Sequence, residues 1–212
     1  MRLAKQAVLL VCVCASMPVY AANWYAGFGV GAGRSRDAAS NVQNGITTLA
    51  GLGISSSATF NTGRAAFNIF GGYQFNRYVA AEIGWIDFGN YNLNGTAVSG
   101  GTSVAVSETD KISAFTLAAV GTIPINQTFS VFGKAGIAVS QDKESCTISG
   151  STCASASDSA TKPMFGIGGE MNASQNVGLR LEYDQYNNIG NSNNEYTAGD
   201  FYQVALSGLY RF

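Results

Sequence analysis

The sequence predicts an all-β fold, an eight-stranded antiparallel β-barrel, and three observations support this prediction. Eight segments of about ten residues alternate at every second position between an apolar and a small or polar side chain. The connections between these segments alternate between short turns and long polar segments. The short turns near Asn76, Asn126 and Ser174 recur about every fifty residues. Charged residues make up only 12% of the chain, about half the share usual in a soluble domain. An even number of strands with all short turns at one end is typical of an outer-membrane barrel.

Residues 1–21 are expected to be a secretory signal peptide, which leaves one domain, residues 22–212. Arg2 and Lys5 precede an apolar run that ends at Ala15, and the segment ending at Ala21 offers small residues where signal peptidase reads. A transmembrane helix would need about 20 apolar residues, more than this run provides. Removal of Arg2 and Lys5 leaves ten of the 12 Lys and Arg residues against 13 Asp and Glu, a net charge of −3. No basic patch suggests a nucleic-acid partner.

The first four predicted strands each have an apolar face and a face of mainly Gly, Ala, Thr or amide side chains. Residues 24–32 alternate Trp, Ala, Phe and Val with Tyr and Gly, and residues 67–75 follow the same pattern. Residues 79–86 resume it after a tight turn. The fourth segment, residues 115–123, stops at Pro124, which cannot donate a ladder hydrogen bond.

The last four predicted strands are residues 131–139, 165–171, 177–183 and 202–212, and the middle two form a hairpin in which every charged side chain falls on one face. The long connecting segments are rich in Ser, Thr, Asn and Gly, and we expect them to be four loops. They are residues 33–64, 89–110, 141–162 and 187–200.

Alternation alone does not say whether the apolar face lines a core, as in a soluble lipocalin-like barrel, or meets lipid. The other face is mostly Gly, Ala, Ser and Asn, which suits the crowded inside of a small barrel better than a surface in water. Aromatic residues gather near the strand ends, as in the interfacial girdles of membrane barrels. No Lys or Arg falls on the apolar face between strand ends, where each would cost about 2–4 kcal/mol in lipid. The apolar face is therefore expected to face a membrane.

In that orientation five charged side chains project into the barrel: Glu82, Lys134, Glu170, Arg180 and Glu182. Because an unpaired charge there would be costly, we expect them to pair with one another. The planar fork of Arg180 can bridge two carboxylates, and Glu170 lies opposite it across the ladder. The cluster is either a gate in a narrow pore or a structural plug. We favour the plug, because the interior of an eight-stranded barrel is barely wide enough for its own side chains.

The exported chain keeps two cysteines, Cys146 and Cys153, separated by a short Ser- and Thr-rich segment. In an oxidising compartment we expect them to form a disulfide that closes a tight loop. A zinc site is disfavoured because the chain contains no histidine.

Several short strings resemble the OmpA-like transmembrane-domain family. They are residues 24–27, 72–74, 82–84, 169–171, 179–183 and 187–190. The resemblance implies an eight-stranded barrel with its N terminus and short turns in the periplasm, and an internal polar network that includes Glu82, Glu170 and Arg180. The ending Leu209-Tyr210-Arg211-Phe212 is similar to the terminal aromatic signal, here Tyr210 and Phe212, that the barrel-assembly machinery reads.

The chain departs from that family in two ways. It ends at the last strand, so the family's peptidoglycan-binding domain is not expected, and shorter surface antigens of the opacity-protein type are the nearer comparison. The fourth strand offers Thr116 and Ala118 where the family has an inward Lys, whereas Lys134 supplies a basic side chain on the fifth.

We expect no enzymatic activity and no cofactor or metal. Hydrolytic chemistry in such barrels generally needs a His base, and the chain has none. Glu108 and Asp110 are expected to be solvated loop charges. The leading expectation is a structural or surface protein of the outer membrane of a Gram-negative bacterium. The alternatives are a small solute or ion pore, and an adhesin or surface receptor that acts through its loops.

The expected partners follow from that location. They are outer-membrane lipid and lipopolysaccharide, the barrel-assembly machinery during biogenesis, and a possible host or phage surface ligand that the loops contact.

Overall fold

The computed structural model describes residues 23–36, 38–60, 63–149, 151–187, 189 and 199–212. The expected signal peptide lies outside these residues. In chain order the elements are β1 (Trp24–Ser35), α2 (Ala38–Gly51), β2 (Ser55–Phe60), β3 (Gly63–Asn76), β4 (Val79–Ser99), β5 (Thr102–Pro124), β6 (Phe129–Ile148), β7 (Ser151–Asn172), β8 (Val177–Tyr186) and β9 (Phe201–Arg211). Within the described ranges no helix is both long and apolar enough to cross a membrane.

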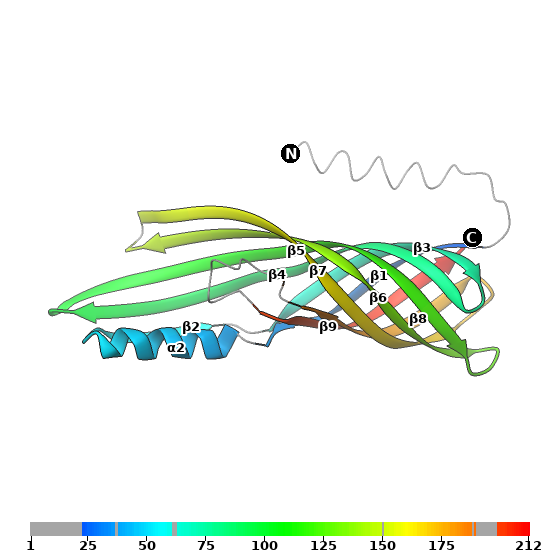
Figure 1. Cartoon of the computed structure of the whole chain (residues 1–212), viewed down its shortest axis with the longest axis horizontal. Helices are drawn as coiled ribbons and strands as arrows, with labels where there is room; N and C mark the ends of the chain where they lie inside the picture. The colour runs from blue at the N-terminus through cyan, green and yellow to red at the C-terminus, as the bar shows by residue number, and fades with distance from the viewer. Residues whose placement is uncertain (1–22, 37, 61–62, 150, 188, 190–198) are drawn as a thin grey trace.

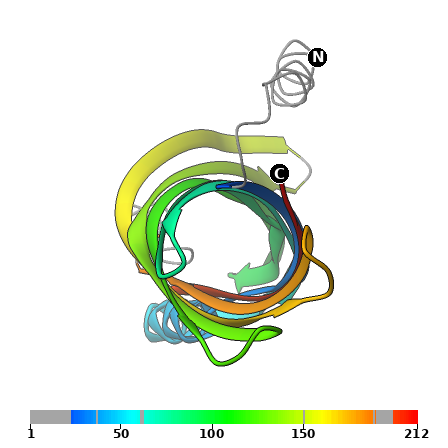
Figure 2. The same cartoon turned by 90° about the vertical axis from the view of Figure 1, so that its right-hand side faces the viewer.

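Eight of the strands form a closed antiparallel ring. Around the ring the order is β4-β3-β1-β9-β8-β7-β6-β5, and pairing of β5 with β4 closes it, as the end-on view in Figure 2 shows. The first and last strands pair along their whole length, from Tyr25 opposite Arg211 to Ser35 opposite Phe201. The predicted eight-stranded antiparallel barrel is therefore confirmed. β2 lies outside the ring, paired to the end of β4.

Three short turns gather at one end of the barrel, at the right of Figure 1. Each is held by one side chain that accepts two backbone N–H groups. Asn76 Oδ1 accepts from Tyr78 and Val79, and Asn126 Oδ1 accepts from Thr128 and Phe129. Ser174 Oγ does the same in the third turn. Short polar side chains of this kind stabilise tight turns, which explains their recurrence in the sequence.

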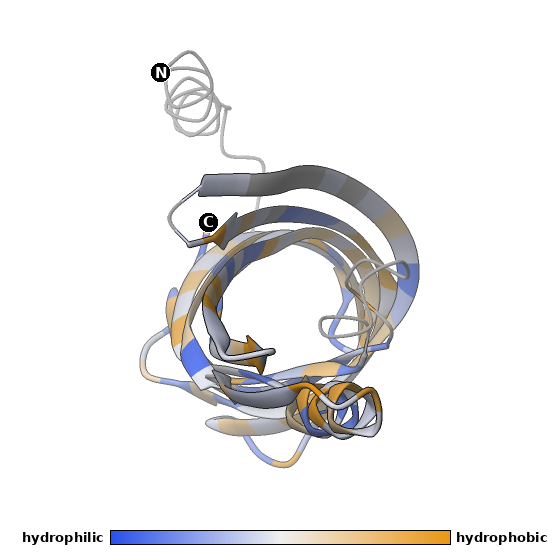
Figure 3. Ribbon diagram, turned by 90° about the vertical axis from the view of Figure 1, so that its left-hand side faces the viewer, coloured by the Kyte–Doolittle hydropathy of each residue, from blue (hydrophilic) through white to orange (hydrophobic). Residues whose placement is uncertain are grey.

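The outer wall of the ring is apolar. Each strand of the ring presents at least one large apolar side chain that is about half exposed: Phe28, Ile69, Ile83, Leu117, Ile137, Ile167, Leu181 and Leu206. Their neighbours along each strand point inward, so hydropathy alternates along the ribbons in Figure 3. An exposed belt of this size would be unfavourable in water and suits lipid.

The long segments at the other end contain more regular structure than the loops that the sequence predicts. β4 and β5 run on as a two-stranded ladder to a turn at Gly100 and Gly101, whose φ angles of 59° and 82° suit a two-residue hairpin. β6 and β7 likewise extend across most of residues 141–162, and these extensions project to the left in Figure 1. The expected strand length of about ten residues holds only for the shorter strands, because β5 has 23 residues.

The first long segment also carries regular structure, including the helix α2. Val42 is buried in α2, and Ile46 and Leu49 follow it at helical spacing on the less exposed side. Gly53 follows the end of the helix with a φ angle of 76°, a left-handed backbone conformation that glycine adopts at little cost in free energy. The fourth long segment lies mostly outside the described residues.

The expectation that Glu108 and Asp110 are solvated loop charges is wrong. Both lie in β5 and are buried, with exposed fractions of 9% and 2%. Both lie on the face of β5 that, further along the strand, faces the barrel lumen.

Candidate functional site in the barrel interior

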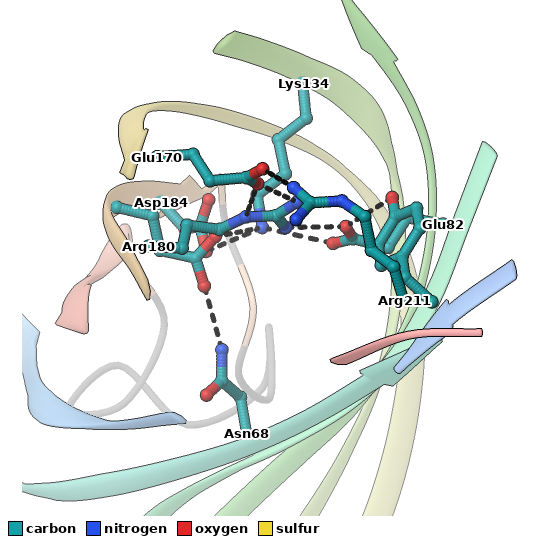
Figure 4. Close-up of polar contacts among 9 residues, drawn as sticks. Asn68, Glu82, Lys134, Glu170, Arg180, Asp184 and Arg211 are labelled. Atoms are coloured by element: carbon teal, nitrogen blue, oxygen red, sulfur yellow. Dashed lines mark hydrogen bonds and ion pairs between the residues drawn. The ribbon is translucent and has the colours of Figure 1, made fainter. Parts of the chain in front are cut away.

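Arg180 lies at the centre of a buried ion-pair cluster inside the barrel (Figure 4). Its Nη1 donates to Glu82 Oε2 at 2.7 Å, and its Nε and Nη2 both donate to Glu170 Oε2, at 3.2 and 3.1 Å. Arg211 Nη2 pairs with the other oxygen of Glu170. Arg180 therefore links carboxylates of β4 and β7, and Arg211 ties β9 to the same group.

Lys134 forms the second cationic centre of the cluster. Its Nζ lies 3.0 Å from Glu182 Oε2, 3.1 Å from Asp184 Oδ2 and 3.6 Å from Glu82 Oε1. Glu82 thus stands between Arg180 and Lys134, one oxygen to each. Because the Lys134 side chain is only 6% exposed, these carboxylates replace the water that an ammonium would otherwise need.

Neutral groups complete the cluster. Asn68 Nδ2 donates to Glu182 Oε1 at 2.9 Å, and the Tyr25 hydroxyl donates to Glu82 Oε2 at 3.1 Å. The Arg180 guanidinium carbon lies 4.8 Å from the ring centre of Phe70 and 4.6 Å from that of Phe132, within cation–π range. The aromatic rings therefore cover faces of the guanidinium that carboxylates do not.

Buried apolar layers lie at both ends of the charged cluster. Towards the short turns one layer contains Tyr25, Phe70, Ala80, Val120, Phe132 and Leu209. Towards the long hairpins a larger layer includes Ile86, Phe88, Tyr91, Ile112, Met164, Tyr186 and Phe201. Phe88 stacks edge-on against Tyr186 at 5.1 Å between ring centres. The innermost charges therefore lie among buried apolar side chains, which strengthens their mutual attraction, whereas Glu170 and Arg211 reach a polar pocket at the short-turn end.

The structure brings together all five charged residues expected inside the barrel: Glu82, Lys134, Glu170, Arg180 and Glu182. Sequence reasoning left Asp184, Arg211, Asn68 and Tyr25 out of this set. Asp184 had a usable signal, because it follows Arg180 and Glu182 at every second position of β8. Tyr25 had none, since an aromatic residue near a strand end is equally typical of the membrane interface.

Four other predicted residues lie away from the cluster. Tyr210 and Phe212 are half exposed and contact each other edge-on, with ring centres 5.3 Å apart, at the short-turn end. Cys146 pairs in register with Ala154, and Cys153 is the extra residue where that register shifts. The side chain of Cys153 is not among those the structure describes.

The arrangement can hold charge and join strands, and each of its charged side chains is paired with at least one opposite charge of the cluster. Four carboxylates meet three cations, drawn from β4, β6, β7, β8 and β9. Within the described residues no group of three or more His, Cys, Asp or Glu side chains is placed to hold a metal ion.

Comparison with known proteins gives consistent matches. The family model of the OmpA-like transmembrane domain matches residues 20–212. Outer membrane protein A of Shigella flexneri is 27% identical over 190 residues, which are 89% of this chain and 48% of that protein. Outer membrane protein A of Klebsiella aerogenes is 29% identical over 144 residues, 68% of this chain and 37% of that protein. The chain thus spans about half the length, or less, of these relatives.

Two solved barrels share the fold at low sequence identity. Neisserial surface protein A has a TM-score of 0.52 and 12% identity, covering 91% of this chain and 100% of that chain. The outer membrane protein OprG from Pseudomonas aeruginosa has a TM-score of 0.53 and 12% identity, covering 90% and 96%.

Proposed function

Because the chain belongs to the family of OmpA-like transmembrane domains, we propose that it is a structural and surface protein of the outer membrane whose barrel is plugged. The short turns face the periplasm, and the extended hairpins and the connections around them face outward. The protein is not an enzyme, and it enters the membrane with a cleaved signal peptide and a terminal signal at Tyr210 and Phe212.

The observation that carries this proposal is the enclosure of the ion-pair cluster. Glu82, Lys134, Arg180 and Glu182 are each less than a tenth exposed, so these four charges have little contact with water. For an ion to pass, several of these contacts would have to break together, and each broken buried pair costs several kcal/mol. A plug therefore needs no further assumption, whereas a pore needs a rearrangement.

Single-channel recording tests the proposal. Residues 22–212, refolded into a planar bilayer, should give no steady openings, with folding shown by the mobility shift between unheated and boiled samples. Glu170→Ala, at the short-turn side of the cluster, should also stay silent, as should the control Lys111→Ala on the extension, where the Lys111 side chain is 57% exposed. Discrete openings that Glu170→Ala alters and Lys111→Ala does not would replace the plug with a gated pore.

One observation favours the pore alternative. Between Tyr25 and Ser35 the lumen-facing positions of β1 are Gly27, Gly29, Gly31 and Gly33, so this stretch of the wall carries no side chains. Neighbouring side chains occupy part of this space, since the ring of Phe70 lies against Gly27. The recording above decides between the two.

A different observation favours binding at the cell surface, as an adhesin or as a receptor for a host or phage ligand. β4, β5, β6 and β7 continue past the ring and carry mostly Ser, Thr, Asn and Ala. Replacing the tip of the β4–β5 hairpin, residues 95–106, by a two-residue turn should abolish cell attachment if this sheet binds. Unchanged attachment would exclude it.

A further inference from the structure

The outer wall of the barrel carries a groove at the short-turn end. It has a volume of about 620 Å³ and is lined by apolar side chains of β6, β7, β8 and β9. Four residues lie side by side across these strands: Val131 faces Gly169, Gly169 faces Leu181, and Leu181 faces Leu206. Gly169 has no side chain, so the wall is notched between Val131 and Leu181.

The notch is open space outside the wall. A Cβ atom built at Gly169 would meet only the Ser130 carbonyl oxygen, at 3.9 Å. The flanking Val131, Leu181 and Leu206 are 42%, 57% and 55% exposed. The groove is therefore a feature of the lipid-facing surface and does not belong to the core.

A polar pocket lies beside the groove at the short-turn mouth. This pocket, of about 470 Å³, is lined by residues of all three short turns and includes Arg77 and Arg211. Asn126, Ser130 and Glu170 line both the groove and the pocket. An apolar groove that borders a cationic, polar pocket matches the polarity of an amphiphile.

The two arginines give the pocket its anion chemistry. Arg77 is exposed in the first turn, with its guanidinium carbon 4.7 Å above the ring of Tyr78, a stacking that leaves the edge of the guanidinium able to donate. Arg211 is partly exposed and pairs with Glu170. Planar guanidinium groups bind phosphate through paired hydrogen bonds.

The dimensions fit one leaflet. Along β9 the strand path from Arg211, which lines the pocket, to Leu206, which lines the groove, spans about 16 Å, or about 12–13 Å along the membrane normal at the usual ~40° tilt. Half of a hydrocarbon core of ~30 Å is about 15 Å. The groove thus begins at the interface, beside the arginines, and ends near the middle of the bilayer.

We propose that this groove and pocket form a phospholipid site, with one acyl chain across Gly169 and the phosphate at Arg77 and Arg211. The site belongs to the leaflet at the short-turn end, which is the periplasmic leaflet in the proposed orientation. It holds one lipid in preference to the lipids that surround the rest of the belt, and it goes beyond the plugged-barrel function.

Photo-cross-linking tests the site directly. The refolded protein, in vesicles of phosphatidylethanolamine and phosphatidylglycerol, is irradiated with a phosphatidylethanolamine that carries a diazirine in its acyl chain. Peptides that contain Val131, Leu181 and Leu206 should be labelled far more than those that contain Ile83 or Leu117 at comparable exposure. Even labelling around the belt would overturn the proposal.

Two variants sharpen the test. Gly169→Leu fills the notch and should lower labelling of the groove about tenfold, because the side chain displaces many acyl-chain contacts. Gly121→Leu is the matched control: Gly121 also lies three residues before its strand ends, is exposed, and has only the Gly133 carbonyl oxygen, at 4.0 Å, near its Cβ position. Equal loss in both variants would overturn the site.

The headgroup is tested by Arg77→Gln. This change should weaken labelling by the phosphatidylethanolamine probe and leave labelling by a diacylglycerol probe with the same acyl chain unchanged. Loss with both probes would overturn the phosphate contact. If Gly169→Leu instead abolished cross-links between two copies of the protein, the groove would be a contact between copies and the lipid site would be wrong.

Discussion

At the scale of single residues, Arg180 joins both the ionic and the aromatic contacts of the interior. Its guanidinium pairs with Glu82 and Glu170 and lies against the rings of Phe70 and Phe132. A lysine could not reproduce this, because it has no planar fork and no flat face to stack. The cluster therefore depends on the identity of Arg180 as well as on its charge.

Arg180→Met removes that fork and leaves Glu82 and Glu170 buried near excess negative charge. Loss of one partner from a buried ion-pair network costs about 3–5 kcal/mol, and we expect this loss of unfolding free energy in urea titrations of the vesicle-bound protein. Lys111→Met, which breaks an exposed pair 4.0 Å from Asp87, should cost about 1 kcal/mol or less.

A rescue separates the stranded charge from lost packing. Adding Glu170→Gln to Arg180→Met should restore part of the stability, because one of the unpaired buried carboxylates becomes neutral. An unfolding transition unchanged by Arg180→Met would contradict the network itself.

The membership of the cluster was predictable only where charge and alternation agreed. Glu82 and Lys134 stand out because they are the charged residues among small inward neighbours on their strands. Arg211 lies at the end of the last strand, where a charge is equally expected at the membrane interface. Asn68 and Tyr25 join through hydrogen bonds that depend on three-dimensional proximity across the barrel, and no sequence spacing reports that.

At the scale of elements, the ring strands were predictable and the extensions were not. Inside the membrane one face must be apolar, so β8 reads as strict alternation from Val177 to Tyr183. Beyond the ring both faces of a strand can be polar, and the period-two signal disappears. Residues 92–109 therefore have the composition of a loop although they form a ladder in which Leu93 faces Glu108 and Val98 faces Ser103.

The proposed Cys146–Cys153 disulfide would cross-link the two strands of the extended β6–β7 ladder. The register brings their backbones to neighbouring positions at the end of the ladder. A ring this short restrains the unfolded chain little, so the bridge should contribute under about 3 kcal/mol. We expect that stabilisation to stay within the hairpin.

Thiol alkylation followed by mass spectrometry measures this. Protein exported in vivo should take up no alkylating reagent until it is reduced. Cys146→Ser should speed protease cleavage near residues 143–157 and leave the unfolding midpoint of the barrel unchanged. A free thiol at either position in exported material would remove the disulfide.

At the scale of the whole molecule, the barrel reverses the usual distribution of polar and apolar side chains in a water-soluble protein. An ion-pair cluster is buried at its centre, and many large apolar side chains lie exposed on its outer wall. Closure follows from β1 pairing with β9 and β4 with β5, which leaves the ring without a free edge in the membrane. Such an arrangement is stable only when lipid is the solvent of the wall.

That dependence can be measured by placing one charge at two depths. Leu117 points outward from the middle of β5 and is 52% exposed, and Val98 points outward near the tip of β4 and is 39% exposed. In water both Leu117→Arg and Val98→Arg would be surface substitutions, which usually change stability by about 0.5 kcal/mol or less. In lipid an Arg near the midplane costs about 2–4 kcal/mol. We therefore expect Leu117→Arg to lower the unfolding free energy in vesicles by that amount and Val98→Arg to leave it nearly unchanged, because Val98 lies past the last pairing of β4 with β3, at Asp87. Equal effects at the two positions would mean that the apolar belt does not face lipid, and the membrane-spanning assignment of the ring would have to be given up.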